Sequence, residues 1–383
     1  MANTITSVLP SIFAGLDQVS RELVGFIPSV QRDATVERAA VGQSVTVPVV
    51  PAATGGNITP AATPPDDGDV VVGSLAVSIT KSKYSPVRWN GEEQLALGSG
   101  GQYNKILADQ FAQAMRWLTN QVEVDIWTAA YKAASRAYGT AGTAPFGTAG
   151  DLTDFAGVNK ILDENGAPMF GRRLIVGGAA RYNLEGKQSI LFKANENGND
   201  AFLRQRILAT TMGFGIGYSA AVSAVTKGTG ASYTTSAAGF AVGTTSIPII
   251  TGTGTVLAGD VVTFAGDTNK YVVKTGVAAA GTIVLNAPGL LVAIPASATA
   301  MTIGNNFTPS IAYTENAMVL AARAPALPTG GDSADDRYTV VDPVSGLSFE
   351  VSLYREYRRI RYEVAMAWGV GVVKPEHIAE LIG

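Results

Sequence analysis

The sequence predicts an α+β protein into which a small all-β domain is inserted. Residues 102–138 contain no Gly or Pro, and their apolar residues recur three or four positions apart, which is typical of one long amphipathic helix. Stretches rich in β-branched residues precede and follow this run and predict strands. Residues 223–304 contain five charged residues and alternate short Val, Thr and Ile runs with Gly turns, which indicates a separate all-β domain.

The composition indicates a folded protein. Its 383 residues are 46% hydrophobic, enough for more than one core. Lys and Arg number 28 against 31 Asp and Glu, whereas a dedicated nucleic-acid binder carries a marked basic excess. Charged residues make up 15% of the chain, well below the roughly 25% of ordinary soluble domains. Such a composition suits a chain that buries surface against copies of itself.

The sequence offers no catalytic constellation. Cys is absent and His377 is the only His. Thiol chemistry is therefore excluded, and few side chains of the kinds that bind transition metals are present. His377 has Glu376 and Glu380 nearby, but a metal site needs three or four convergent ligands. Residues 213–217, GFGIG, do not complete a dinucleotide-binding glycine pattern. We therefore expect no catalytic, cofactor-binding or metal site, and no enzyme activity.

The sequence shows no targeting or membrane-spanning pattern. Its first residues lack the basic segment of a secretory signal, and no stretch approaches 18 consecutive apolar residues. We therefore expect synthesis in the cytoplasm without export.

Residues 1–42 are expected to form an N-terminal helical arm. Apolar residues recur three or four positions apart over residues 8–27, and Pro28 ends the pattern. The same periodicity fits a core helix, so both placements remain open.

Residues 43–90 are expected to form an extended hairpin. Residues 43–50 and 69–89 are rich in β-branched residues, while Pro and Gly between them prevent regular structure. An isolated hairpin is marginally stable in water, so a neighbouring subunit is the expected support, with folding back onto its own domain as the alternative. Three acidic residues lack the calcium-loop pattern and predict a solvated tip. They are Asp66, Asp67 and Asp69.

Residues 91–150 are expected to hold the long helix. At 1.5 Å per residue, residues 102–138 give a helix of about 55 Å. Gly139 follows as a natural helix stop. A helix of this length crosses a whole domain and forms its spine.

The rest of the chain divides by composition. Residues 151–222 alternate helix and strand patterns, including a strand over 172–178, and predict a mixed α/β module. Residues 223–304 are the all-β insertion, and residues 305–335 resume the earlier pattern. Residues 336–383 carry long strands and end in a pattern that predicts a short helix.

The run YREYRRIRY, residues 354–362, interleaves arginines with tyrosines as nucleic-acid grooves do. At a period of two it predicts an amphipathic strand. One face would carry Arg355, Tyr357, Arg359, Arg361 and Glu363, and the other Ile360, Tyr362, Val364, Met366 and Trp368. Four arginines face two glutamates over residues 352–363, which favours a salt-bridge network between strands or subunits. Weak contact with DNA is the alternative.

The order of these parts resembles that of the major capsid protein of tailed double-stranded DNA bacteriophages, with the Hong Kong ninety-seven type of fold. The likeness is to the short-tailed-phage coat proteins that carry an inserted β domain. Residues 16–43, LDQVSRELVGFIPSVQRDATVERAAVGQ, look like their amino-terminal region. Residues 316–328, NAMVLAARAPALP, and 342–357, DPVSGLSFEVSLYREY, look like their carboxy-terminal part.

That resemblance implies a role for each segment. Residues 43–90 would be the E-loop lying across a neighbour, and the long helix would be the spine of a peripheral domain completed by residues 336–383. Residues 151–222 and 305–335 would form the axial domain around five-fold and six-fold axes. The family assembles pentamers and hexamers into an icosahedral virion capsid, with a portal protein through which DNA is packaged. No long N-terminal extension is present, so a separate scaffolding protein is implied.

We expect the assembly interface to use charged side chains from the second strand of the hairpin, the residues directly after it, and the C-terminal strands. Opposite charges on adjoining subunits would fix their register. These residues are Lys81, Lys83, Arg88, Glu92, Glu93, Arg355, Glu356, Arg358, Arg359, Arg361 and Glu363.

Two other classes of function remain. An encapsulin-like protein compartment shares the fold expected here, although the inserted β domain disfavours it. A β-rich surface or adhesion protein would explain the Gly and Thr content of the middle of the chain, but the long helix and the missing export signal count against it.

Overall fold

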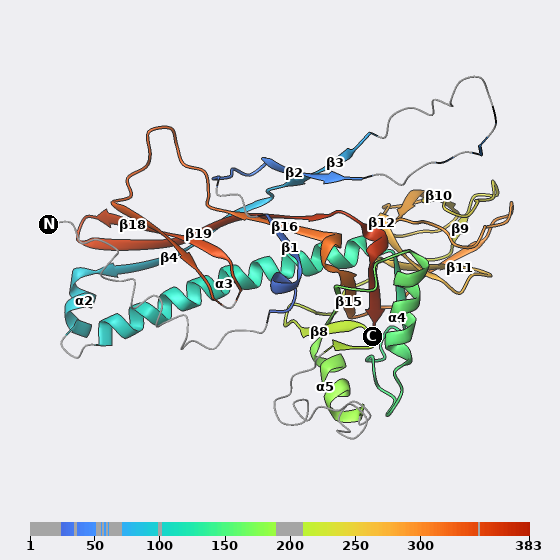
Figure 1. The fold of residues 1–383 in the computed structure, drawn as a ribbon, viewed down its shortest axis with the longest axis horizontal. Coiled ribbons are helices and arrows are strands. Elements are labelled where there is room, and N and C mark those ends of the chain that lie inside the picture. The colour runs from blue at the N-terminus through green and yellow to red at the C-terminus, as the bar shows by residue number, and fades with distance from the viewer. Residues whose placement is uncertain are drawn as a thin grey trace.

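In the computed structural model, two large β-sheets lie along one long helix, and two further strands form a small sheet of their own (Figure 1). The helix predicted over residues 8–27 lies almost entirely outside the described residues, and Ile27–Ser29 form the short 3-10 helix η2. The structure describes residues 24–33, 37–50, 55, 57–58, 60, 71–98, 102–188, 210–343 and 345–383.

Helix α3 (Gln102–Ala133) runs along the long axis of the molecule (Figure 1). Its predicted apolar stripe is confirmed, because the residues three or four positions apart are buried. They are Leu107, Phe111, Met115, Leu118, Val122, Ile126 and Ala130. The helix therefore owes its stability to the surfaces packed around this stripe.

The prediction that the helix continues to Tyr138 is wrong. Arg136–Gly139 form strand β5, which pairs in parallel with β20 (Ile378–Ile382) and antiparallel with β12 (Lys270–Thr275). Pairing on both edges outweighs the helical pattern of these few residues. Gly139 has a φ of 102°, and a Cβ there would collide with the Ile382 carbonyl, so strand packing demands this glycine.

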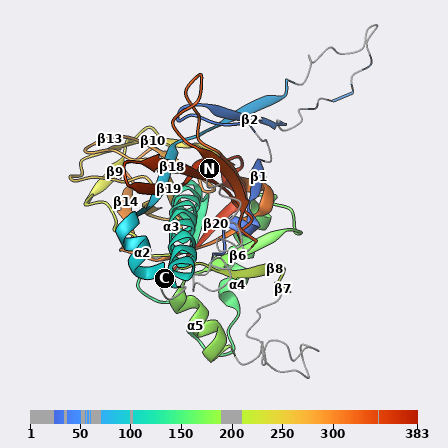
Figure 2. The same ribbon diagram turned by 90° about the vertical axis from the view of Figure 1, so that its left-hand side faces the viewer.

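The first sheet covers one side of α3. Its strands follow the order β1, β16, β19, β18 and β17, and β4 pairs with β19. Figure 2, seen along the molecule, shows α3 end-on below β18 and β19, and the ring centroids of Phe111 and Tyr362 lie 5.2 Å apart. The strands are β1 (Gln31–Asp33), β4 (Lys81–Asn90), β16 (Met318–Arg323), β17 (Asp336–Val341), β18 (Ser348–Glu356) and β19 (Arg359–Val372).

The hairpin predicted over residues 43–90 is shorter than expected. Strands β2 (Ser44–Val49) and β3 (Gly73–Ser78) pair only with each other and form a two-stranded arm. All ten residues of β4 instead pair with β19. Val87 and Trp89 are buried there, so β4 contributes to the core around α3.

The second sheet has twelve strands, and β5 beside β12 joins its two halves. One half lies within residues 223–304, which form strands and turns without a helix. Its buried residues make a hydrophobic cluster of their own. The strands of this half are β9 (Tyr233–Thr235), β10 (Ser246–Ile250), β11 (Val261–Phe264), β12, β13 (Gly281–Leu285) and β14 (Ala300–Ile303).

The other half of the second sheet holds β5 and β20 together with strands from the predicted α/β module. Helices α4 (Thr153–Glu164) and α5 (Gly178–Lys187) pack against it, with Phe155, Leu162 and Leu184 in a shared cluster. The further strands are β6 (Arg172–Val176), β7 (Thr210–Thr211), β8 (Phe214–Tyr218) and β15 (Pro309–Thr314).

The short helix predicted at the end of the chain is wrong. Pro375–His377 form the 3-10 turn η5, and Ile378–Ile382 are strand β20 between β15 and β5. All five residues of β20 are buried. A strand paired on both edges satisfies its backbone inside a core, and this explains why the helical pattern does not prevail.

Glu380 is the unusual residue of β20. It is fully buried, and neither carboxyl oxygen has a hydrogen-bond partner in the described part of the chain. Burial raises its pKa well above the ordinary value of 4.5. Burial also raises the pKa of Tyr131 on α3, and the charges of Glu380 and Asp260 add to that shift. Burial therefore favours the protonated form of the Glu380 carboxyl in the folded chain.

Replacing Glu380 with Gln should remove a pH dependence of stability. Above pH 4.5 the unfolded chain releases this proton while the native chain keeps it, so native stability falls as pH rises toward the raised pKa. We expect the unfolding free energy of the wild type to fall by up to about 1.4 kcal/mol per pH unit in that window. Urea unfolding at a series of pH values measures the slope, which should be shallower for Glu380→Gln.

The matched control for this experiment is Glu37→Gln at an exposed position, which should follow the wild type. Parallel pH profiles for the wild type and Glu380→Gln would contradict a raised pKa of Glu380.

Candidate assembly interface

The sheet of β4, β19 and β18 has a face covered by α3 and an open face. Lys81 and Lys83 lie on the covered face, since they pair across strands with the buried Trp368 and Met366. Lys81 Nζ donates to Asp125 Oδ1 at 2.6 Å. Asp125 Oδ2 also accepts from the Trp368 indole at 2.8 Å. Both predicted lysines thus lie against the helix of their own chain.

The second lysine contacts α3 one turn away. Lys83 Nζ donates to Gln121 Oε1 at 2.7 Å, and its ammonium lies 5.5 Å from the centre of the Trp117 ring. These contacts bind β4 to the spine helix. These contacts do not test whether Lys81 and Lys83 also contact another subunit, which remains a prediction.

The single amphipathic strand predicted through YREYRRIRY is wrong, because the run is a β-hairpin. Glu356 pairs with Arg359, and Tyr357 and Arg358 form a two-residue turn in which Arg358 has a φ of 53°. The turn reverses the chain, so Arg355 pairs with Ile360 and shares its face. Arg355 therefore lies on the face opposite Arg361.

The apolar face predicted from Ile360 onward agrees with the structure. Tyr362, Val364, Met366 and Trp368 are buried, and Ile360 packs partly buried against them. The alternation fails only at the turn.

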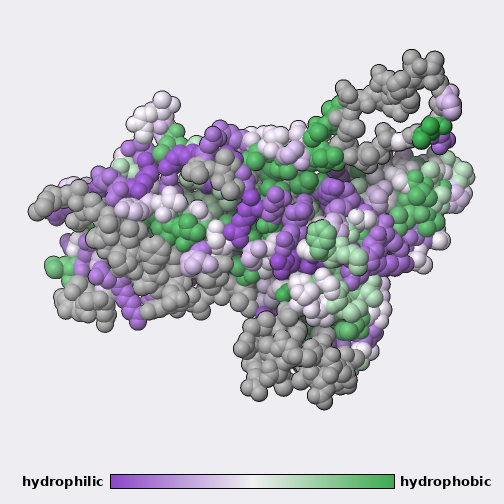
Figure 3. Space-filling view, viewed as in Figure 1, coloured by the Kyte–Doolittle hydropathy of each residue, from purple (hydrophilic) through white to green (hydrophobic). Residues whose placement is uncertain are grey.

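Arg361 is the centre of the open face. Its guanidinium lies 5.3 Å from the ring centre of Tyr84 and 5.9 Å from that of Tyr354. It also donates to Glu363 at 2.5 Å. The exposed Arg88 stands directly opposite on β4. In Figure 3 the surface over this sheet is mostly hydrophilic, whereas hydrophobic residues follow the β2–β3 arm.

Three of the four arginines in the run have carboxylate partners in their own chain. Arg359 Nε donates to Glu356 at 2.6 Å, and Arg355 Nε lies 3.1 Å from Asp335. Arg361 and Glu363 form the third pair. Partly exposed pairs of this kind contribute little to stability, so they are available for exchange with charges on another molecule. Whether these arginines also form salt bridges with another subunit remains a prediction.

A groove lies at the end of the sheet, between the hairpin turn and helix α2 (Gly91–Gly98). It has a volume of about 990 Å3, and we call it the tip groove; its walls are residues 89–92, 94–95 and 355–360. Gly91 N donates to the Arg358 carbonyl at 3.3 Å and ties the walls together. Leu95 is 78% exposed and Tyr357 is 90% exposed.

The two glutamates predicted for the interface have different positions at this groove. Glu92 lines it. Glu93 instead caps α2: its Oε2 accepts from Asn90 N at 3.0 Å, and Asn90 Oδ1 accepts from Glu93 N at 2.7 Å. Glu93 therefore has a structural role that its charge alone did not indicate.

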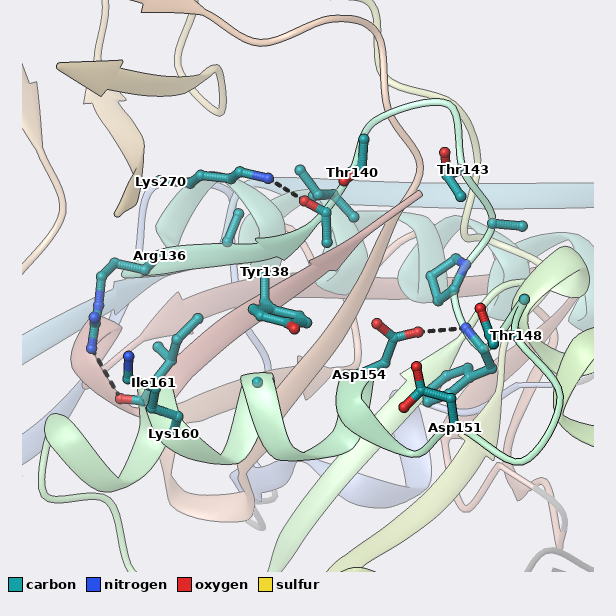
Figure 4. Close-up of a pocket in the computed structure, with 18 of the residues that line it drawn as sticks. Arg136, Tyr138, Thr140, Thr143, Thr148, Asp151, Asp154, Lys160, Ile161 and Lys270 are labelled. Carbon is teal, nitrogen blue, oxygen red and sulfur yellow. Dashed lines mark hydrogen bonds between the residues drawn. The ribbon is translucent and has the colours of Figure 1, made fainter. Parts of the chain in front are cut away.

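A second cleft, of about 1000 Å3, lies between α4, the loop of residues 140–148 and β12 (Figure 4). Its charged groups are used in local contacts. Asp154 Oδ2 accepts from Phe146 N at 2.5 Å, and Arg136 Nη1 donates to Glu164 at 2.7 Å. Lys270 Nζ donates to the Gly139 carbonyl, and burial lowers the Lys270 pKa. We find no nucleophile paired with a base among these described residues.

The described residues also show no cluster of metal ligands and no membrane-spanning helix. No three His, Asp or Glu residues gather as metal ligands within the described ranges. Burial lowers the pKa of His377, whose neighbours Glu376 and Lys374 shift it in opposite directions. In the described residues, no helix combines the length and apolar character that crossing a membrane requires.

Comparison with solved structures places this architecture among phage capsid folds. The capsid structure of cyanophage P-SCSP1u matches with a TM-score of 0.50 and 12% identity, covering 95% of this chain and 89% of that one. A structure from Mycobacterium phage Che8 matches at a TM-score of 0.47 and 14% identity, over 95% and 92% of the two chains. The mature capsid of bacteriophage PhiM1 matches at 0.47 and 10%, over 95% and 88%.

The chain therefore has the fold of a phage capsid protein, and the predicted α+β class is confirmed. No family model and no curated protein matches its sequence. At 12% identity the likeness concerns the fold alone.

Replacing Asp125 with Ala should destabilise the packing of α3 against β4 and β19. The Trp368 indole N–H would lose its acceptor inside the core, and Lys81 would lose its carboxylate. We expect a loss of about 1–3 kcal/mol in unfolding free energy, with Asp125→Asn losing less because an amide oxygen still accepts.

Urea unfolding measures both variants, and Asn104→Ala on the exposed side of α3 is the control. A loss for Asp125→Ala no larger than that of the control would contradict the role of Asp125.

Proposed function

We propose that this chain is the major capsid protein of a tailed double-stranded DNA bacteriophage and assembles into an icosahedral shell. The observation that carries the proposal is the fold match with the cyanophage capsid over 95% of the chain. The shell would consist of pentamers and hexamers and form the virion capsid.

The surface of the single chain supports this proposal. Val77 of the two-stranded arm is buried against its own chain, but the residues at the far end of the arm are exposed and apolar: Val50 is 69% exposed and Val71 is 78% exposed. An isolated hairpin is marginally stable in water, so a neighbour offers the missing surface. Many contacts of modest strength allow errors to be corrected during assembly, and multivalency stabilises the closed shell.

Each part of the fold has a proposed place. Helix α3 with the first sheet would be the peripheral domain, and the half sheet with α4 and α5 would be the axial domain around the symmetry axes. Residues 223–304 would be the inserted β domain, and the β2–β3 arm the E-loop. A scaffolding protein, a portal protein and weak contacts with packaged DNA are the proposed partners, and the bacterial cytoplasm the place of synthesis.

Electron microscopy of the purified chain, alone and with proteins encoded beside it, tests this function. Closed icosahedral particles are the expected result, and DNA-filled particles from infected cells would support the phage assignment. Particles that enclose protein cargo would favour a protein compartment. A monodisperse monomer under every condition would contradict the proposal.

Deleting residues 51–68 should leave a folded monomer that assembles poorly. Val49 pairs with Gly73, so residues 50 and 69–72 remain as a five-residue loop, a length that hairpins tolerate. Thermal unfolding should stay close to the wild type, whereas particle yield by sedimentation and electron microscopy should drop. Normal particle yield from the deletion would contradict the E-loop assignment.

Replacing both Arg359 and Arg361 with Gln should lower particle yield or heat stability. The change removes two cations from the open face: Arg361, which lies against two tyrosine rings and pairs with one carboxylate, and Arg359, which pairs with another carboxylate. Lys274→Gln, at an exposed position of β12, is the control and should assemble normally. Intact particles in which only DNA packing has changed would instead assign these arginines to nucleic acid.

A further inference from the structure

The six strands within residues 223–304 pair in a closed ring, which we call the barrel. Only two residue pairs join the barrel to the rest of the second sheet: Lys270 of β12 with Ala137 of β5, and Tyr271 with Arg136. By comparison, β5 and β20 pair over four residues, and β20 and β15 over five. We call the contact of β12 with β5 the barrel seam. As the shortest of these pairings, it opens at the least cost in hydrogen bonds.

The last turn of α3 also holds the barrel. Asn286, which follows β13, donates from Nδ2 to the carbonyls of Lys132 and Ala134, each at 2.9 Å, and so satisfies the end of the helix from the barrel side. The ring of Tyr131 lies against Gly259, where an added Cβ would be 2.5 Å from the ring. These contacts close the barrel seam along the helix.

Two carboxyl groups are buried beside the barrel seam. Glu380 of β20 pairs with Ala137 of β5, and neither of its carboxyl oxygens has a hydrogen-bond partner within the described ranges. Asp260 of the barrel is 1% exposed, and its Oδ1 accepts from Gly228 N at 3.0 Å. The charges of both carboxyl groups raise the pKa of Tyr131. An ionised Glu380 would therefore be a buried charge without a hydrogen bond, near a second acid.

The cations near the barrel seam have other partners. Lys270 shares a face of the sheet with Glu380, because Ala137 between them pairs with both. Its ammonium instead donates to the Gly139 carbonyl. The Lys132 ammonium lies 5.8 Å from the centre of the neighbouring tyrosine ring. Neither lysine is thus placed as a counter-ion of the buried glutamate.

The remaining elements around Glu380 do not favour its ionised form either. Arg136 lies on the opposite face of β5, where α4 supplies its carboxylate partner. On β15 the residue paired with Glu380 is the apolar Ile311. Burial raises the pKa of Asp260, and Lys227 opposes that shift. A charge on Glu380 would therefore need water to reach it.

We propose that the proton on Glu380 controls the attachment of the barrel to the rest of the chain. While the Glu380 carboxyl is neutral, the barrel seam stays closed. When the carboxyl ionises, water enters at the barrel seam, because the two pairs there separate before the longer pairings of β20 do. The barrel then moves independently of α3. This switch belongs to the single chain and does not depend on shell formation.

Hydrogen–deuterium exchange of the full chain at a series of pH values tests the switch. The series runs from about pH 5 to about pH 9, since buried glutamates titrate in this range. After correction for intrinsic exchange, the protection of amides in β5 and β12 should fall by up to about tenfold per pH unit, because opening releases one proton that the closed chain holds. Amides of β18 and β19 should keep their protection throughout.

Two variants separate the switch from general instability. Glu380→Gln keeps a neutral side chain of the same shape, and Glu380→Leu removes the titrating group altogether. Both should show protection of β5 and β12 that does not change with pH, while Glu37→Gln, at an exposed position, should follow the wild type.

Three results would overturn the proposal. In the first, the protection of β5 and β12 in the wild type does not depend on pH. In the second, the Glu380 variants lose protection with pH as steeply as the wild type does. In the third, β18 and β19 lose protection together with β5 and β12, which would mean that the whole chain unfolds instead of opening at the barrel seam.

Discussion

Burial of the apolar stripe of α3 is the constraint on which both sheets depend. At one end, Phe111 packs edge-on against Tyr362 of the first sheet. At the other, the Trp127 indole donates to the Pro309 carbonyl at 3.3 Å, at the start of β15 in the second sheet. Residues from both sheets belong to the one buried cluster around this helix. Because α3 buries its stripe against both sheets, it fixes the position of one sheet relative to the other.

Hydrogen bonds and ion pairs fix the position of α3 among the apolar side chains packed around it. Glu123, which is 2% exposed, accepts from the backbone N–H groups of Gly25 at 2.6 Å, Phe26 at 2.9 Å and Ile27 at 3.0 Å. Two residues further along the helix, Asp125 accepts from the Trp368 indole and from Lys81. Since unpaired buried groups are costly, these contacts favour one register of helix against sheet. The spine thus positions the N-terminal segment, β4 and β19 together, and through β4 it positions the tip groove.

Elements in which apolar residues recur regularly over many positions could be predicted from the sequence. Examples are the buried stripe of α3 and the buried face of β19 from Ile360 to Trp368. It failed where pairing partners decide the outcome. Arg136–Gly139 and Ile378–Ile382 have helical neighbours and helical patterns, but each becomes a strand because another strand lies beside it. The turn at Tyr357 and Arg358 has neither Gly nor Asn, so no local signal marked it, and the face of Arg355 was assigned wrongly. The candidate interface residues were selected by charge alone, which cannot distinguish Glu93 as a helix cap from Glu92 on the groove.

The proposed shell requires that another copy of the chain covers the exposed part of the β2–β3 arm. A cryo-electron microscopy reconstruction of particles formed by the wild-type chain tests this most directly. It should show an icosahedral shell in which the β2–β3 arm of each subunit crosses a neighbour. A chain that remains monomeric, or a shell in which the arms contact no neighbour, would contradict the proposed assembly.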